Sequence, residues 1–225
     1  MIKLNNINLI FKQRPVLTSF NLTLKAGEKI ALLGPSGVGK SSILKLLCGI
    51  YHPTAGTVLN QAQRIGYIFQ EARLLPWLTV EQNIAQVLIP LKLEQAEITD
   101  RIDAILKDVE LSGFSQHYPH QISGGMAQRV SLARAFIIEP DLLLLDEPLS
   151  ALDPALKKQL SRFIQHYVTK YNPTLIYVSH HPEDALPIVD QCLLLSKNKP
   201  HQQFCLHQTS GIEHIIEQFY HSEEQ

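Results

Sequence analysis

The sequence predicts an α/β fold built on a parallel sheet, and two observations support this. Two short runs, Leu142 to Leu145 and Thr174 to Ser179, are almost continuously apolar, which is typical of strands buried on both faces. A stretch with helical spacing, Leu156 to Thr169, separates them, and strands that alternate with helices form parallel sheets. The 225 residues suffice for a single domain, 1–225, with a modest insertion.

The N-terminal region predicts further strands. Ile2 to Phe11 mixes β-branched and polar residues, and Phe20 to Leu24 alternates apolar with polar positions, as a half-buried strand does. Pro15 and Ser19 are expected to interrupt the stretch between these two strands. Lys29 to Leu33 is a short apolar strand that leads directly into a glycine-rich loop.

The middle of the chain predicts a helical insertion. Thr79 to Leu111 has apolar residues on one helical face, and a second helix is expected from about Gly125 to Ile138. A short packed helix is expected over Thr209 to Tyr220, and Lys197 to Gln203 reads as a polar loop. The predicted division is an α/β core of residues 1–70 and 140–205, a helical subdomain of residues 71–139 and a helical tail of residues 206–225.

Charge and composition exclude some classes of function. A formal net charge of −1 gives no electrostatic case for nucleic acid as a partner. The 10 histidines lack metal-ligand spacing, since His180 and His181 are adjacent and neighbouring side chains point different ways. The 3 cysteines lie far apart and are expected to be reduced structural thiols.

No stretch of the sequence predicts direct insertion into a membrane. The first residues lack the apolar segment of a secretory signal, and no window approaches the ~20 apolar residues that span a bilayer. Any membrane role is therefore expected to come through a partner.

The glycine-rich loop predicts a polyphosphate site. It matches G-x-x-x-x-G-K-[ST] between a predicted strand and a helix, Ser41 to Ile50. The glycines let backbone N–H groups turn toward a polyphosphate, and the helix adds the positive end of its dipole. Lys40 is expected to reach the β- and γ-phosphates, and the Ser41 hydroxyl to bind Mg²⁺. The alternative is a chance glycine turn. The loop is Gly34, Pro35, Ser36, Gly37, Val38, Gly39, Lys40 and Ser41.

Two acids follow the apolar run of Leu142 to Leu145. Asp146 at the carboxyl end of a buried strand beside a phosphate loop can hold hydrated Mg²⁺. Glu147 would then polarise the attacking water as a general base. Taken alone, two acids after a strand are usually a solvated turn, and the upstream loop is what favours the catalytic interpretation.

A second glycine pair stands at the start of the helix predicted in the insertion. Ser123 is a good N-cap, so simple capping is one interpretation of Ser123-Gly124-Gly125. Consecutive glycines at a helix start also expose N–H groups and so predict a second anion site. One polyphosphate cannot easily occupy both sites.

Taken together, these motifs resemble those of the ATP-binding subunits of ABC transporters, over nearly the whole chain. The glycine-rich loop resembles Walker A, Leu142 to Glu147 resembles Walker B, and Ile122 to Gln128 resembles the family signature, with Ile for the usual Leu. Ser150 to Asp153 resembles the D-loop. Three single residues match family positions as well: Gln70 the Q-loop glutamine, His180 the switch histidine and Phe11 the aromatic that stacks on adenine.

The resemblance implies a P-loop NTPase (RecA-like) core with an antiparallel β edge and a helical subdomain insertion. It implies ATP and Mg²⁺ as cofactors, with Glu147, His180 and Gln70 catalytic and Ser41, Gln70 and Asp146 at the metal. Ser42 stands where threonine is commoner and keeps a hydroxyl. The implied ATP-binding residues outside the loop are Phe11, Ser42, Gln70, Ser123, Gly124, Gly125, Gln128 and Asp153.

The resemblance also implies partners. Two copies would associate head to tail, with the signature of one copy closing over the γ-phosphate on the Walker A loop of the other, which accounts for two anion sites in one chain. The segment Gln70 to Asn83 would receive membrane permease subunits, with Trp77 as an aromatic anchor, although Trp77 and Leu75 could equally pack internally. The chain would lie peripherally on the cytoplasmic face of the plasma membrane.

The same segment resembles the Q-loop of nitrate, sulfonate and taurine importers. The leading hypothesis is therefore an ATP-hydrolysing import subunit that works with a separate permease and a solute-binding protein. The alternative is an ABC ATPase that gates a cell-envelope machine of the cell-division or lipoprotein-release type.

Overall fold

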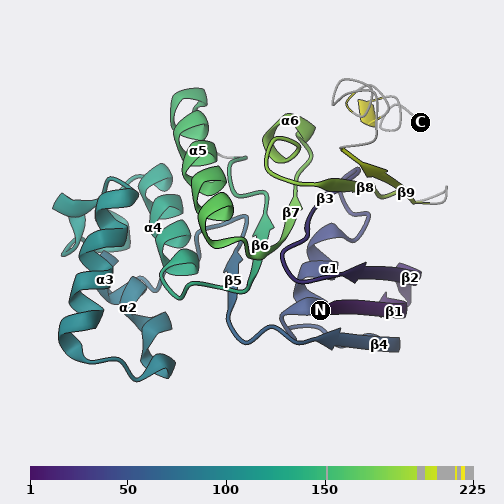
Figure 1. Ribbon diagram of the computed structural model, residues 1–225, viewed down its shortest axis with the longest axis horizontal. Coiled ribbons are helices and arrows are strands. Elements are labelled where there is room, and N and C mark those ends of the chain that lie inside the picture. Colours follow the sequence, from purple (N-terminus) through teal and green to yellow (C-terminus); the bar gives the residue numbers. More distant parts are fainter. Residues whose placement is uncertain (151, 197–200, 207–215, 217–218, 221–225) are drawn as a thin grey trace. The chain divides into compact units, whose positions relative to one another are not determined.

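Two sheets and a group of helices make up the computed structural model (Figure 1). It describes residues 1–150, 152–196, 201–206, 216, 219 and 220. These form two compact units. The first unit is Met1–Ile65, Asp141–Glu147 and Asn172–Gln225, and the second is Gly66–Pro140 and Pro148–Tyr171.

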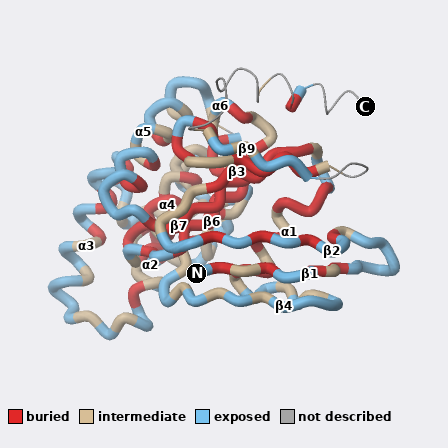
Figure 2. The backbone as a smooth tube through the Cα atoms, turned by 45° about the vertical axis from the view of Figure 1, so that its right-hand side comes forward, coloured by how far each residue is buried: buried red, intermediate tan, exposed pale blue. Residues whose placement is uncertain are grey.

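The larger sheet of the first unit carries the most continuously buried strands. Its strands run in the order β6-β7-β3-β8-β9, with parallel pairing from β6 to β8 and an antiparallel partner in β9. All residues of β6 and β7 are buried, as Figure 2 shows in red, and this burial is why both strands are apolar apart from Asp146 and Thr174 at their ends. The strands are β3 (Lys29–Leu33), β6 (Leu142–Asp146), β7 (Thr174–Val178), β8 (Gln191–Leu194) and β9 (Gln202–Cys205).

Parallel pairing places the ends of three strands at one edge of this sheet. Leu32 of β3 and Asp146 of β6 are both in register with Val178 of β7. The residues that follow β3, β6 and β7 therefore leave the sheet together, and two helices, α1 (Lys40–Leu47) and α6 (Pro182–Ala185), begin shortly after β3 and β7.

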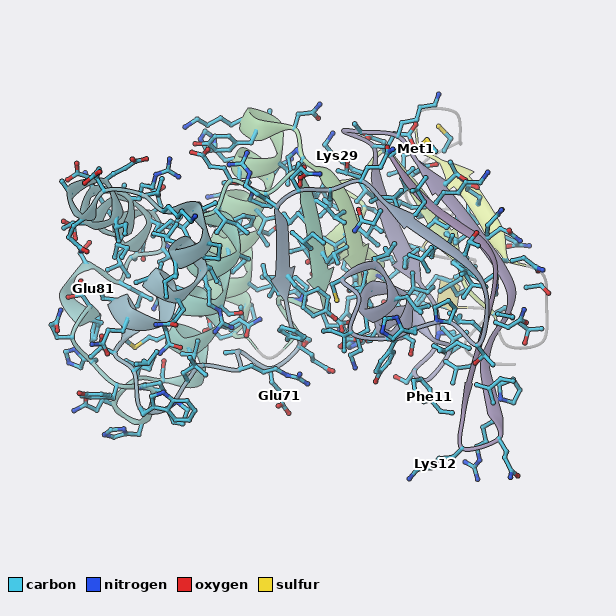
Figure 3. All side chains as sticks on the ribbon, turned by 90° about the horizontal axis from the view of Figure 1, so that it is seen from below. Met1, Phe11, Lys12, Lys29, Glu71 and Glu81 are labelled. Atoms are coloured by element: carbon cyan, nitrogen blue, oxygen red, sulfur yellow. The ribbon has the colours of Figure 1, made fainter. Side chains whose placement is uncertain are left out.

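The smaller sheet is antiparallel, with the order β2-β1-β4. Its strands are β1 (Ile2–Phe11), β2 (Arg14–Leu24) and β4 (Ala55–Asn60). The expected interruption at Pro15 is wrong, because β2 is an edge strand and proline can occupy an edge without removing an inner hydrogen bond. Lys12 and Gln13, both with positive φ, turn the β1–β2 hairpin, whose tip carries Phe11 and Lys12 (Figure 3).

The second unit is mostly helical, as expected for the insertion. The predicted helix from Thr79 to Leu111 is divided into α2 (Val80–Ala85), η1 (Gln86–Leu91) and α3 (Gln95–Asp108). The break lies where Pro90 cannot continue an α-helix and Lys92 takes φ 52°. The unit also contains η2 (Ser112–Phe114), η3 (Pro119–Gln121), α4 (Gly124–Phe136) and α5 (Pro154–Tyr171).

Helix α5 groups with the second unit, whereas the division predicted from the sequence assigns residues 140–205 to the core. Within that unit α5 contacts α4: the Tyr167 hydroxyl donates to the Phe136 carbonyl at 3.1 Å, and the two rings lie 4.2 Å apart. Strand β5 (Ile65–Ile68) is where the chain passes from the first unit to the second.

Other expectations concern the remaining segments. Most of the helix expected over Thr209 to Tyr220 lies outside the described residues, and Phe219 and Tyr220 are helical. Of the loop expected from Lys197 to Gln203, residues 197–200 are not described, and Gln202 and Gln203 belong to β9. The 3 cysteines are free, and no helix in the described part of the chain has the length and apolar character to cross a membrane.

Candidate functional site

The loop between β3 and α1 depends on glycine at both ends. Gly34 has φ 143°, and a Cβ there would lie 2.5 Å from the Leu195 carbonyl oxygen. Gly39 is the N-cap of α1 with φ 106°, and its Cβ would lie 2.8 Å from a methyl carbon of Leu17. Between them, Ser36 and Gly37 are exposed whereas Val38 is buried. The loop is thus fixed by its ends and open along its middle.

Lys40 is the first residue of α1, and its side chain reaches back to the loop. Its side chain is buried, and its ammonium donates to the carbonyl oxygens of Gly34 and Pro35, the latter at 3.0 Å. The first amides of α1 have no side-chain cap, so they remain available to an anion. A buried cation and uncapped amides at one place are a combination suited to a polyphosphate.

The next residues of α1 contact the end of β6. The Ser41 hydroxyl donates to Asp146 Oδ1 at 2.8 Å, and Asp146 is buried. Ser42 follows in the same turn and is partly exposed. Among the described residues there is no cluster of three or more His, Cys, Asp or Glu side chains that could hold a metal. One hydroxyl and one carboxylate nevertheless fit Mg²⁺, which takes few protein oxygens and fills its other positions with water and phosphate.

Glu147 and His180 form a pair at the same edge of the sheet. His180 Nδ1 lies 3.0 Å from Glu147 Oε2. The Glu147 backbone takes φ 49°, and its N–H donates to the Val178 carbonyl at 3.0 Å, so the carboxylate leaves the strand at a fixed angle. The backbone before His181 is held by Ser179, whose hydroxyl accepts from the His181 N–H at 2.9 Å.

His180 is expected to orient Glu147, which leads to a test. Replacing His180 with Ala removes a hydrogen bond of the charge-assisted kind, worth about 1.5–3 kcal/mol, and should lower kcat for ATP roughly 10–100-fold with little change in ATP affinity. Steady-state hydrolysis and equilibrium binding measure the two effects. His181→Ala is the matched control. It removes the neighbouring imidazole, whose ring centre lies 4.1 Å from that of His180, and it keeps the two bonds to Ser179, because the His181 backbone makes them. Equal losses in both variants would contradict the assignment.

Phe11 is paired with a second aromatic residue that sequence reasoning missed. Its ring is 40% exposed and meets the Tyr51 ring edge to face, with centroids 4.8 Å apart. The Lys45 ammonium lies 5.4 Å from the Tyr51 ring centre. Tyr51 follows α1 in a turn, and nothing in its local sequence predicts a contact with residue 11.

The second unit contains the signature glycines. Ser123 caps α4, accepting from the Met126 N–H at 3.2 Å, and leaves Gly124 exposed. Gln128 is buried, and its amide donates to the Pro148 carbonyl at 3.0 Å. Its side chain therefore serves the interior of this unit, and the geometry gives the expected nucleotide contact of Gln128 no support.

Asp153 and Gln70 also lie in the second unit. Asp153 accepts from the N–H groups of Ala155 and Leu156 at 3.1 and 3.0 Å, so it caps the start of α5. Ala151 of the expected D-loop lies outside the described residues. Gln70 is exposed after β5, and Trp77 further along this segment is 69% exposed. The alternative in which Trp77 packs internally is thereby excluded within this unit, whereas Leu75 is half-buried.

The expected site residues therefore fall into two groups. The first unit brings together the loop 34–42, Asp146, Glu147 and His180, with Phe11 on the β1–β2 hairpin. The second unit holds Gln70, Ser123, Gly124, Gly125, Gln128 and Asp153.

Comparison with known proteins identifies the class. A family model described as ABC transporter matches residues 17–150, more than half of the chain. The chain belongs to the ABC transporter family, which confirms the predicted resemblance and the predicted α/β fold class.

Among curated proteins, the chain is similar to ATP-binding proteins of import systems. The chain is 38% identical over 218 residues to the sulfate/thiosulfate import ATP-binding protein CysA 1 of Agrobacterium fabrum, covering 89% of this chain and 62% of that protein. It is 35% identical to the aliphatic sulfonates import ATP-binding protein SsuB of Bacillus cereus, covering 87% and 81%. The chain thus spans less than two thirds of the length of several curated relatives.

A solved structure shows the same architecture. The dimeric post-hydrolysis state of the ATP-binding cassette MJ0796, bound to ADP and Pi, superposes with a TM-score of 0.84 at 28% identity. The match covers 92% of this chain and 99% of that one.

Proposed function

We propose that this chain binds ATP with Mg²⁺ and hydrolyses it. The observation that carries the proposal is the cluster at the carboxyl edge of the larger sheet. The Lys40 ammonium reaches back to the glycine-bounded loop, the Ser41 hydroxyl is bonded to Asp146 at 2.8 Å, and Glu147 is 3.0 Å from His180. A cation, a pair of oxygen ligands and an oriented carboxylate are the parts that phosphoryl transfer to water requires.

Each part has a separate task. Lys40 would exchange its bonds to the loop carbonyls for the β- and γ-phosphates, since an ammonium can turn its three donors to new acceptors. Ser41 and Asp146 would hold Mg²⁺, and the family resemblance implies Gln70 as a further ligand. When bound, Mg²⁺ neutralises charge on the β- and γ-phosphate oxygens. Glu147 would accept the proton of the attacking water, and His180 would keep its carboxylate oriented.

The second group of residues is proposed to act on the ATP of another copy. Two glycine-flanked helix starts in one chain, that of α1 without a side-chain cap and that of α4 capped by Ser123, suit a head-to-tail homodimer, in which Ser123, Gly124 and Gly125 close over the partner's γ-phosphate. Gly124 is exposed at the start of α4, and a Cβ at this position would meet nothing within 4 Å. Packing within the unit therefore does not require glycine here. Asp153 would serve the same interface.

The proposed process is ATP-driven import through separate membrane permease subunits, on the cytoplasmic face of the plasma membrane. The import names of the relatives support this over the cell-division and lipoprotein-release alternative, and they favour a sulfur oxyanion or sulfonate as the solute. A solute-binding protein would complete the system. The segment Gln70 to Asn83 is proposed to receive the permease, because Trp77 presents an exposed aromatic anchor there.

Co-purification tests the docking segment. Tagged chain isolated from detergent-solubilised membranes of its own cells should bring a multi-span membrane protein with it, identified by mass spectrometry. Trp77→Ala should reduce recovery of that protein at least ~10-fold, because central aromatic anchors contribute about 2 kcal/mol or more. Ile89→Ala removes another side chain, 63% exposed, that lies outside the segment, and serves as the control. A partner with a large periplasmic domain and few spans would instead support the alternative.

A further inference from the structure

Two side chains brace the segment that follows Gln70, within the second unit. The first is Arg134, in the last turn of α4. Its Nη2 donates to the Ala72 carbonyl at 2.9 Å and its Nη1 to the Arg73 carbonyl at 3.2 Å. A guanidinium presents its donors in a fixed fork, so these two bonds set both the distance and the orientation of the segment relative to α4.

The second brace is Asn83, on α2. Its amide is buried, 1% exposed, and its Oδ1 accepts from the Leu75 N–H at 2.8 Å. Its Nδ2 lies within bonding distance of the carbonyl oxygens of Leu75, Leu78 and Thr79, at 3.1, 3.1 and 3.0 Å. The backbone between residues 72 and 79 is therefore held from both sides, and Trp77 is exposed on a preformed support.

The two ends of α4 carry the signature glycines and Arg134. Its first residues are Gly124 and Gly125, capped by Ser123, and Arg134 lies 10 residues after Gly124, about 15 Å along the axis. A helix of this length is stiff compared with a loop, because each turn is hydrogen-bonded to the next. A displacement of the glycines would therefore be transmitted along α4 to the backbone of Ala72 and Arg73, to which Arg134 is bonded.

The surroundings of Arg134 show that the contact is part of the packed unit. Burial lowers the pKa of the Arg134 guanidinium, although arginine remains charged at any physiological pH. A partly desolvated charge needs strong acceptors, and the two backbone carbonyls supply them.

We propose that Arg134 is a positioning residue that fastens the segment 72–79 to the signature helix, so that ATP captured by the glycines of α4 repositions the docking segment around Trp77. The proposal rests on the proposed function, in that it assumes an ATP-bound dimer. It adds a physical connection that needs no contact of Arg134 with nucleotide or permease.

The experiment uses the full chain carrying Glu147→Gln, in which the ATP-bound dimer is expected to persist. Trp77 is the sole tryptophan of the sequence, so its emission reports on the segment alone. Size-exclusion chromatography with Mg²⁺ and ATP scores the dimer, and amide hydrogen exchange of residues 72–79 scores the brace without nucleotide. Arg134→Gln should speed that exchange about tenfold and reduce the Trp77 response to ATP at least fivefold while the dimer still forms.

Arg129 provides the matched control. It lies on the same helix, and its Nη1 also reaches two backbone carbonyls, those of Val109 and Glu110 at 3.2 and 3.3 Å, which lie outside the segment. Arg129→Gln should leave the exchange of residues 72–79 and the Trp77 response as in the parent. Arg134→Lys keeps the charge without the fork and should give intermediate values, and it substitutes for Arg134→Gln if thermal melting shows that variant to be unfolded.

The outcomes separate the two proposals. If the parent does not form a dimer with ATP, the proposed homodimer fails, and the exchange of residues 72–79 alone decides whether Arg134 is a brace. If the dimer forms and Arg134→Gln shows unchanged exchange or an unchanged Trp77 response, the positioning role is overturned. If the parent forms the dimer but its Trp77 emission does not change with ATP, the proposed connection between the α4 glycines and the segment 72–79 is also overturned.

Discussion

Replacing Glu147 with Gln lowers kcat for ATP hydrolysis by at least ~100-fold and leaves ATP affinity essentially unchanged. General-base catalysis contributes roughly 10²–10⁴-fold, and an amide cannot accept the proton of the attacking water. Gln has the same shape and can still meet His180, so the local backbone, including the φ of 49° at residue 147, has no new reason to change. Steady-state ATPase rates and equilibrium binding of a fluorescent ATP analogue measure the two quantities.

Interpretation of that variant requires a control for lost charge. Glu183→Gln removes an exposed carboxylate three residues after His180 and should keep the parent kcat. Undiminished hydrolysis by Glu147→Gln would sink the assigned role of Glu147. A parallel loss of ATP affinity would show instead that the carboxylate supports the binding site.

The fold could be predicted from the sequence where the burial of a strand is evident in its own residues. β6 and β7 are buried on both faces, and this alone makes their segments apolar and recognisable. The predicted interruption at Pro15 is wrong because a sequence does not say which strand lies at the edge of a sheet. The same holds for the long helix expected from Thr79 to Leu111, whose break at η1 depends on a single proline and a residue of positive φ.

The site could be predicted only as far as its parts are local motifs. The loop 34–41 and the acids at the end of β6, Asp146 and Glu147, lie in short segments with fixed chemistry, so their spacing indicates their use. Arg134 and Tyr51 act through partners 62 and 40 positions away, Ala72 and Phe11, and no short pattern records such contacts. The nucleotide contact of Gln128 stays a prediction from its place in a motif, and the bond of its amide to the Pro148 carbonyl, 20 positions away, is a contact that the motif does not record.

Replacing Lys40 with Ala is expected to abolish measurable ATP binding. Hydrogen bonds to charged groups contribute about 1.5–3 kcal/mol each, so loss of contacts to two phosphates should raise Kd about 10²–10⁴-fold. Ala is the best helix former, and α1 should therefore persist. The buried Gly34 carbonyl loses a donor, which should lower Tm by a few degrees without unfolding the chain.

Lys25→Ala is the control for the loss of ATP binding in Lys40→Ala. Lys25 is an exposed lysine of the first unit, so its removal takes away the same charge from the same unit without touching the loop. Calorimetric titration with Mg²⁺ and ATP should give parental affinity for Lys25→Ala and no binding isotherm up to millimolar ATP for Lys40→Ala. Parental affinity in a folded Lys40→Ala protein would refute the loop as the polyphosphate site, because no other buried cation donates to the carbonyls of this loop among the described residues.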